Sequence, residues 1–260
     1  MAKKIAIAIH KGGVGKTTTA KNLAAALAQS GRRTLLIDLD EQANATKGLG
    51  VNPGDVPVTL NDLFNNPEIE PTAAVLTTGI DGLHLIAAHP NLSRTETGMA
   101  VQRSDPNAPD PIEALKGLLS GLEDHYDFII LDTPPSLGYM TINALAAADE
   151  LLIPVAASAY SADGLARTLE AYERAIAPKG YNPGLRLRGI LITRFKRTNA
   201  SSSVFDTIGE AYSDYLMPQL IVESTGVDEA EQLEQPVVVY DPKNPAAQGY
   251  KRVAEILNNG

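Results

Sequence analysis

The sequence predicts an α/β fold: a doubly wound, mostly parallel sheet with helices on both faces. Short apolar runs alternate with helical patterns along the whole chain, as is typical of such sheets. Most apolar runs are continuous stretches of Ile, Leu and Val, as expected for strands buried on both faces. A glycine-rich segment separates the first apolar run from the first helical pattern. No linker or composition shift divides the 260 residues, so we expect a single domain over residues 1–260.

Each element is predicted from its local pattern. The predicted strands are Ile5–Ile9, Thr34–Asp38, Leu83–Ala87, Phe128–Leu131, Leu151–Val155, Gly189–Thr193 and Val237–Tyr240. The predicted helices are Lys16–Ser30, Ile112–Leu122, Tyr139–Ala148, Ala162–Ile176, Ser203–Leu216 and Ala246–Leu257. Ser93–Pro111 predicts a loop, or a short helix followed by a loop, and Asn52–Pro57 predicts a turn-rich connection. Ligands of such sheets lie at the carboxyl ends of the strands, where we therefore expect the functional residues.

The composition excludes several kinds of site. The chain is 44% hydrophobic and 20% charged, which is ordinary for a globular protein. It contains no cysteine, which excludes disulfides, thiolate zinc sites, cysteine nucleophiles and cysteine-ligated iron–sulfur clusters. No apolar run approaches the ~18 residues of a membrane span, so we expect a cytoplasmic protein without a membrane partner. A net charge of −9 argues against a generally basic nucleic-acid binder but leaves room for a local basic face.

The strongest chemical signal is the segment Lys11-Gly12-Gly13-Val14-Gly15-Lys16-Thr17-Thr18, between an apolar strand and an Ala/Leu-rich helix. Glycines let the backbone wrap around phosphates so that successive N–H groups point at oxygen, and the helix adds the positive end of its dipole. Lys16 is placed to neutralise the β- and γ-phosphates, and the Thr17 hydroxyl can ligate Mg²⁺. The segment therefore predicts a phosphate-binding loop.

This loop departs from the common pattern, because His10 stands at the first glycine position and Lys11 lies five residues before Lys16. It resembles the deviant Walker A motif of the ParA/MinD group of P-loop ATPases. The resemblance implies that ATP is the nucleotide, that Lys16 acts in cis, and that Lys11 reaches across a homodimer to the phosphates of the other subunit. A second cation at the γ-phosphate would stabilise the transferring charge and couple dimerisation to ATP.

A first pair of acids follows the strand Thr34–Asp38. Side chains alternate along a strand, so Asp38 and Asp40 would share a face if the strand persists that far. The segment resembles the first switch of the family, with Glu41 in place of the usual proline. The resemblance implies that Asp40 orients the attacking water and that Asp38 supports Mg²⁺ through water. Two acids that simply end a strand are the alternative.

The strand Phe128–Leu131 delivers Asp132 to its carboxyl end, as in a Walker B motif, where a carboxylate holds Mg²⁺ or its water shell. The following Thr133-Pro134-Pro135 resembles the second switch of the family, which implies that its backbone senses the γ-phosphate.

The resemblance runs nearly end to end. Residues 161–165 resemble the family's "ALEGL" helix start, and residues 240–247, YDPKNPAA, are similar to the ending of its ParA/Soj branch. Thr193, Arg194, Val222 and Glu223 match places where the family touches adenine. Most such contacts use backbone groups, so plain loops would fit these positions equally well.

Basic residues are concentrated in one region. Residues 174–205 contain seven basic residues and no acid, whereas residues 206–242 contain nine acids and no Lys or Arg. The family's ATP-bound dimers bind DNA without sequence preference, which implies a patch of Lys196 and Arg197 with Arg186 or Arg188. The acid Glu223 stands where Soj-type members carry arginine. A solvated basic face would give the same charge pattern.

The resemblance implies an ATPase that forms a homodimer with ATP, binds DNA non-specifically and positions a plasmid, a chromosome or a protein compartment near the nucleoid. It also implies that a ParB-like or other cargo-adaptor protein stimulates hydrolysis. A MinD-like membrane cycle would need a basic amphipathic C-terminal extension, which residues 249–260 do not resemble. A metabolic relative with the same nucleotide core is the remaining alternative.

Overall fold

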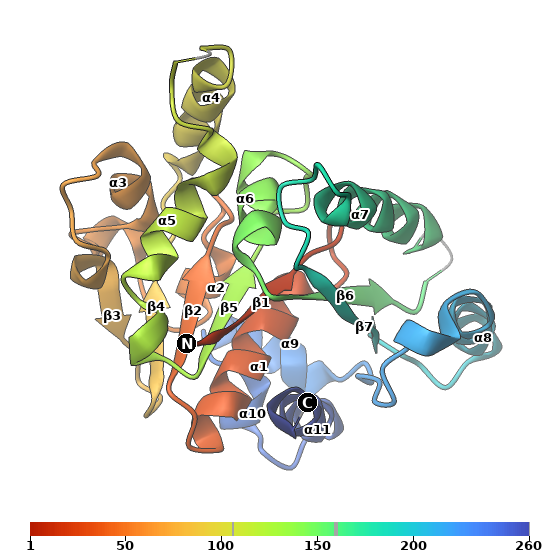
Figure 1. Ribbon diagram of the computed structural model, residues 1–260. Helices are drawn as coiled ribbons and strands as arrows, with labels where there is room; N and C mark the ends of the chain where they lie inside the picture. Colours follow the sequence, from red (N-terminus) through yellow and green to blue (C-terminus); the bar gives the residue numbers. More distant parts are fainter. Residues whose placement is uncertain (106, 159–160, 260) are drawn as a thin grey trace.

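The computed structural model describes residues 1–105, 107–158 and 161–259 (Figure 1). Its strands are β1 (Lys3–Ile7), β2 (Thr34–Asp38), β3 (Val75–Thr77), β4 (Leu83–Ile86), β5 (Phe128–Asp132), β6 (Glu150–Ala156) and β7 (Arg186–Thr193). Its α-helices are α1 (Lys16–Gln29), α2 (Asn44–Lys47), α3 (Leu60–Asn65), α4 (Leu92–Gln102), α5 (Ala114–Ser120), α6 (Tyr139–Ala147), α7 (Ser161–Ile176), α8 (Asn199–Tyr212), α9 (Thr225–Gln232), α10 (Val237–Tyr240) and α11 (Pro245–Asn259). Short 3-10 turns lie at Pro53–Asp55, Pro71–Ala74, Pro111–Glu113, Glu123–His125 and Ser213–Tyr215.

In these residues seven strands form one sheet in the order β3-β4-β2-β5-β1-β6-β7. Every neighbouring pair is parallel except β3 and β4. The predicted fold class, a doubly wound and mostly parallel sheet, is therefore confirmed. The division into domains is not tested by this topology, and the single domain stays a prediction.

The sheet is covered on both faces, which explains its continuous apolar strands. On β2, Leu35 and Ile37 belong to one core cluster and Leu36 to the other, as the alternation of side chains along a strand requires. The first cluster contains side chains of α5, α6 and α7, and the second contains those of α1, α10 and α11. Figure 1 shows α1, α10 and α11 side by side. The helix that follows the glycine-rich loop is thus held between the sheet and the C-terminal helix.

One predicted strand is wrong, because Val237–Tyr240 forms the helix α10. Pro236 stands at its N-cap, and Val237 and Val238 are buried against α1, where the Val238 N–H donates to Asn22 Oδ1 at 3.1 Å. Three consecutive valines favour a strand in composition, but tertiary contacts override such a weak preference.

The remaining differences lie in element boundaries and in short elements. Strand β7 begins three residues earlier than predicted, and α8 begins and ends four residues earlier. The first strand begins and ends two residues earlier than predicted, at Lys3 and Ile7, and Ser93–Pro111 contains all of the helix α4 except its first residue. The predictions also lacked β3, α2, α3 and α9, which are between three and eight residues long. No helix among the described residues is both long and apolar enough to span a bilayer.

Candidate nucleotide-binding site

The glycine-rich loop joins the end of β1 to the start of α1, in the centre of the sheet. Gly15 is the N-cap of α1 and has φ 86°, a left-handed conformation that favours glycine. The first N–H groups of an α-helix have no partners within the helix, so they are available to an anion at this end.

The Lys16 side chain is only 7% exposed, and its Nζ donates to the Lys11 carbonyl at 2.7 Å. Burial lowers the pKa of Lys16, whereas the nearby Asp132 and Asp40 raise it. The ammonium group of Lys16 therefore lies buried inside the loop, near the carboxylates of Asp132 and Asp40. An incoming phosphate would offer it a charged partner in place of the carbonyl.

The start of α7 packs directly on the loop. The Thr168 hydroxyl accepts from the His10 N–H at 2.9 Å and donates to the Gly164 carbonyl at 2.7 Å. A Cβ at Gly164 would lie 3.0 Å from the His10 carbonyl oxygen and 3.1 Å from Lys11 Cβ. The segment that resembles the family's "ALEGL" helix start thus leaves little room for a side chain at Gly164, and it packs closely on the chain at His10 and Lys11.

The predicted metal acids end adjacent strands. Asp38 and Asp132 are register partners on β2 and β5 and are both fully buried. Asp38 accepts from the Thr46 N–H at 2.9 Å and the Thr46 hydroxyl at 2.8 Å, and from the Asp40 N–H at 3.1 Å. Burial raises the pKa of Asp38 to about 6, although the hydrogen bonds from Thr46 oppose this rise. These bonds fix Asp38 to the segment that contains α2.

Asp132 differs from Asp38, because neither of its oxygens has a hydrogen-bond partner among the described residues. Burial and then the neighbouring Asp38 raise the pKa of Asp132 well above its usual range, while the Thr17 hydroxyl and Lys16 act to lower it. A buried carboxylate whose oxygens make no hydrogen bond of ordinary geometry is costly even beside the Thr17 hydroxyl and Lys16, and it calls for an explanation. A divalent cation between Thr17 and Asp132 would provide one, so the residues present fit Mg²⁺.

Asp40 lies where the two segments that resemble switches meet. Its carboxylate accepts from the Gln42 N–H at 3.0 Å, and its side chain is 7% exposed. With Pro134, Pro135 and Ser136, it lines a groove of about 280 Å³. The structure thus brings together the two segments that resemble the first and second switches of the family.

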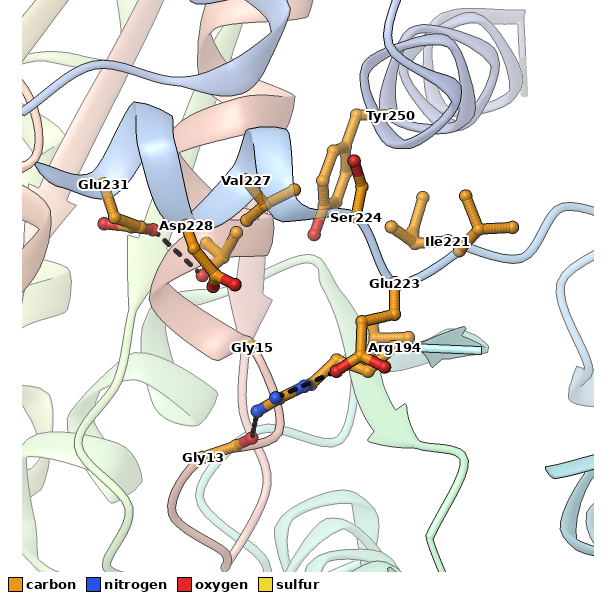
Figure 2. A pocket seen from close by; sticks show the side chains of 13 residues that line it. Gly13, Gly15, Arg194, Ile221, Glu223, Ser224, Val227, Asp228, Glu231 and Tyr250 are labelled. Carbon is orange, nitrogen blue, oxygen red and sulfur yellow. Dashed lines mark hydrogen bonds and ion pairs between the residues drawn. The ribbon is translucent and has the colours of Figure 1, made fainter. Parts of the chain in front are cut away.

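A cavity of about 200 Å³ adjoins the loop (Figure 2). Gly13, Gly15 and Thr18 form its wall on the loop side. The residues predicted to meet adenine line the same cavity, and they are Thr193, Arg194, Val222 and Glu223. The Thr193 hydroxyl also donates to the Val14 carbonyl at 2.7 Å, which ties the end of β7 to the loop.

Arg194 lies across one side of this cavity in Figure 2, between Gly13 and Glu223. Its guanidinium donates to the Gly13 carbonyl at 3.2 Å and to Glu223 Oε1 at 3.2 Å. Its backbone has φ 50°, which non-glycine residues seldom adopt and which recurs at functional sites. Glu223 Oε2 also pairs with Lys196 Nζ at 2.6 Å, so one carboxylate is shared by two cations.

The sequence analysis missed the cavity wall formed by α9 and α11. Val227, Asp228 and Glu231 line the cavity from α9, and Tyr250 lines it from α11. Burial raises the pKa of Tyr250 to about 12. The one available signal was Ser224, a good N-cap residue, whose side chain accepts from the Gly226 N–H at the start of α9.

The structure does not bring the four residues predicted for the DNA patch together, and the patch stays a prediction. Arg186 and Arg188 lie at the start of β7, where both pair with the buried Glu150, whereas Lys196 and Arg197 follow the other end of that strand. An extended strand of 8 residues separates the two groups by roughly 26 Å. Arg188 also donates to the Ile256 carbonyl at 2.8 Å, near the end of α11. The basic residues thus form two groups, and their roles stay predictions.

Comparison with known proteins agrees with this site. The family described as an AAA domain matches residues 2–186. The chain is 36% identical to the sporulation initiation inhibitor protein Soj of Bacillus subtilis, over 100% of both chains.

Two solved structures are also similar. Cobyrinic acid a,c-diamide synthase from Mycobacterium smegmatis, with bound ADP and magnesium, has a TM-score of 0.84 at 30% identity and covers 99% of this chain and 94% of its own. An ATP complex of a McdA variant from Cyanothece has a TM-score of 0.86 at 28% identity and covers 99% of this chain and 96% of its own. Since sequence similarity over the full length and the geometry of the phosphate loop agree, the chain belongs to the ParA/Soj family of ATPases.

Proposed function

We propose that this chain hydrolyses ATP to ADP and phosphate with Mg²⁺, and that its ATP-bound homodimer binds DNA non-specifically to position cargo. The observation that carries the proposal is the buried junction of β1, β2 and β5, where Lys16 faces two carboxylates and Asp132 has no hydrogen-bond partner among the described residues. A magnesium–triphosphate complex supplies the charges that this junction requires.

The residues of the site divide into three roles. The backbone of residues 12–18 cradles the phosphates, and Lys16 neutralises them from within the same chain. Thr17 and Asp132 would hold Mg²⁺, which would neutralise charge on the phosphates, and Asp38 would support its water shell. Asp40 orients the attacking water.

Lys11 is proposed to act in trans, on the nucleotide of a second copy of the chain. The tight contact between Gly164 and the backbone of His10 and Lys11 supports this role, because it fixes the start of the Lys11 side chain. A positioned cation that arrives from the partner would stabilise charge on the γ-phosphate, as an arginine finger does. The dimer would then depend on ATP.

DNA binding is proposed for the group that contains Lys196 and Arg197, because it lies beside the nucleotide cavity. Phe195, Lys196 and Arg197 line a second groove that shares Val222 and Glu223 with that cavity. Dimerisation would double this group and add phosphate contacts, each of which strengthens salt-dependent binding. Arg186 and Arg188 would form a separate and weaker site, since both pair with Glu150.

The proposal is tested by the binding of labelled duplex DNA with ATP, with ADP and without nucleotide, over a series of salt concentrations. Binding is expected only with ATP and is expected to fall steeply with salt. Lys11→Ala should abolish both the ATP-dependent dimer, measured by light scattering, and the binding of DNA. Lys116→Ala is the matched control, because Lys116 is an exposed lysine on α5. A wild-type protein that remains monomeric with ATP would contradict the trans role of Lys11.

The activator and the cargo are proposed from similarity to other proteins and not from the geometry of the site. We infer a ParB-like or other adaptor protein as the activator, with a location on the nucleoid, because similar proteins are described as chromosome-partitioning proteins. A metabolic role is the alternative, given the similarity to cobyrinic acid a,c-diamide synthase. ATP hydrolysis that is stimulated by DNA and an adaptor, without any small-molecule acceptor, would favour the first.

A further inference from the structure

Helix α4 supplies an acid to the start of another helix. Glu96 lies on the second turn of α4, and its Oε1 accepts from the Met140 N–H at 3.3 Å, in the first turn of α6. Gly138 stands at the N-cap of α6 and has no side chain with which to cap it. Because the first N–H groups of a helix have no partners within it, a carboxylate is stabilising at this end. Glu96 therefore serves as the cap that α6 itself lacks.

Gly138 leaves the space that the Glu96 carboxylate occupies. A Cβ at Gly138 would overlap Glu96 Oε1 and would lie 3.0 Å from Glu96 Cδ. The backbone of Gly138 has φ −80°, which any residue adopts, so its conformation does not require glycine. A side chain at this position would instead displace the end of Glu96, which is flexible, from the start of α6.

Helix α4 is itself anchored close to Glu96. The Thr95 hydroxyl donates to Asn61 Oδ1 at 2.7 Å and accepts from Asn65 Nδ2 at 2.7 Å. Both asparagines lie on α3. Although α4 projects from one end of the molecule in Figure 1, these bonds hold its first turn in place. Glu96 thus reaches α6 from a fixed support.

The first turn of α6 holds residues 133–136, which contain the segment that resembles the second switch. The Thr141 hydroxyl donates to the Ser136 carbonyl at 2.6 Å. At the other end of this segment, the Thr133 hydroxyl donates to the Ile7 carbonyl at 2.9 Å, on β1. The segment is therefore tied to the sheet at its start and to α6 at its end, and its position depends on where α6 begins.

We propose that Glu96 is a positioning residue for ATP hydrolysis. It lines the same groove as residues 134–136 and Asp40, the residue proposed above to orient the attacking water. By holding the start of α6, Glu96 fixes these residues beside Asp40. A misplacement of about 1 Å can lower the rate of a reaction about a hundredfold. The inference rests on the proposed role of Asp40, but it concerns hydrolysis and not the binding of nucleotide.

The test is the kinetics of ATP hydrolysis with Mg²⁺ and duplex DNA, together with calorimetric titration of ADP. Glu96→Ala removes the carboxylate, and Gly138→Ala displaces it from the opposite side. Each should lower kcat about tenfold, because a loosely held segment aligns the reacting groups less often. The KM for ATP and the affinity for ADP should stay within about twofold of the wild type. Expressing kcat per ADP-binding site removes any effect of unfolded protein.

Further variants separate the contact from the loss of a charge. Glu96→Gln keeps an acceptor for the Met140 N–H and should retain most of kcat. Glu96→Ala/Gly138→Ala should be no slower than either single variant, because both changes remove the same contact. The matched controls are Glu173→Ala, at an exposed glutamate on α7, and Gly98→Ala on α4, with open space at its Cβ. Both should leave kcat unchanged.

An unchanged kcat in Glu96→Ala would overturn the inference and leave the proposed function intact. Equal losses of kcat and of ADP affinity would also overturn it, because they would show a general effect on the fold. So would additive losses in Glu96→Ala/Gly138→Ala. If the wild type binds no ADP or hydrolyses no ATP, the proposed function fails as a whole, so the two failures are distinguishable.

Discussion

Lys21 on α1 and Glu231 on α9 form an ion pair with 2.5 Å between Nζ and Oε2, and this pair leads to a prediction about stability that is asymmetric between its two partners. The Lys21 side chain is 1% exposed, whereas the Glu231 side chain is 38% exposed and faces the cavity. Glu231→Leu would leave a buried ammonium without its counter-charge, whereas Lys21→Met would leave a carboxylate that water can still reach. The first change should therefore be much the more damaging.

Removing one partner of a buried ion pair typically costs about 3–5 kcal/mol. We expect Glu231→Leu to cost about 3 kcal/mol, the lower end, because the pair is partly open to solvent on the side of Glu231. Lys21→Met should cost less than about 1 kcal/mol, since methionine can fill the lysine channel with similar volume. Lys21→Met/Glu231→Leu should be close to the wild type, because replacing a buried pair by apolar groups is often neutral.

The assay is urea denaturation of the four proteins without nucleotide, treated as a double-mutant cycle. The free energy of unfolding of each single variant gives its own cost, and the cycle gives the coupling between the two side chains. Equal costs for Glu231→Leu and Lys21→Met would refute the reasoning from burial. A coupling below about 0.5 kcal/mol would show that the 2.5 Å contact contributes nothing to stability.

Three further predictions concern other residues. Burial raises the pKa of Asp38 from 3.8 to about 6, so the folded state binds an extra proton between these values. The contribution of Asp38 to the stability of the nucleotide-free protein should thus fall by up to roughly 3 kcal/mol as pH rises from 4 to above 6. Asp38→Asn should remove this contribution, measured as the change in the free energy of unfolding between pH 4 and pH 8. Gly164→Val should weaken ADP binding at least about tenfold in calorimetry by pushing on His10 and Lys11, whereas Gly117→Ala, with open space at its Cβ, should not. Glu223→Gln should strengthen DNA binding by the ATP state, measured by anisotropy.

The sequence was sufficient to predict the phosphate loop and the acids beside it, because the carboxyl ends of parallel strands lie at the same edge of the sheet. Asp38 and Asp132 are separated by 94 positions, but each ends a continuous apolar run, and a parallel sheet places such ends at one edge. The loop between β1 and α1 follows from the same rule. These patterns could not predict which of the two acids makes hydrogen bonds. Asp38 accepts hydrogen bonds from Thr46, whereas neither oxygen of Asp132 has a hydrogen-bond partner among the described residues.

The other side of the cavity could not be predicted for a physical reason. Helix α9 contains only eight residues, and four of its side chains are acidic or amide, so its pattern is weak. Lys21 and Glu231 are 210 positions apart, and Lys21 lies on a helix where an exposed lysine would look identical in sequence. Only the packing of α9 against α1 reveals that this lysine is buried and that Glu231 lines the nucleotide cavity.

Because the basic residues form two groups, the acid Glu223 lies beside only one of them, the group of Lys196 and Arg197. Glu223 accepts from Arg194, which also donates to the loop at Gly13, and it pairs with Lys196 on the proposed DNA-binding groove. Both ion pairs are more than a quarter exposed, so they contribute little to stability. They matter because of charge. The carboxylate of Glu223 neutralises Lys196, the cation that would otherwise meet a DNA phosphate.

Glu223→Gln removes that charge while keeping the size of the side chain. If Lys196 is a DNA contact, the ATP state of the variant should bind duplex DNA more tightly, and the slope of log affinity against log salt should steepen by about 1 per protomer. Glu255→Gln, an exposed acid on α11, is the matched control for net charge. A change in both variants would point to net charge alone, and an unchanged slope in Glu223→Gln would exclude Lys196 from the DNA interface. DNA binding would then have to rest on Arg197 or on the group of Arg186 and Arg188 at the start of β7.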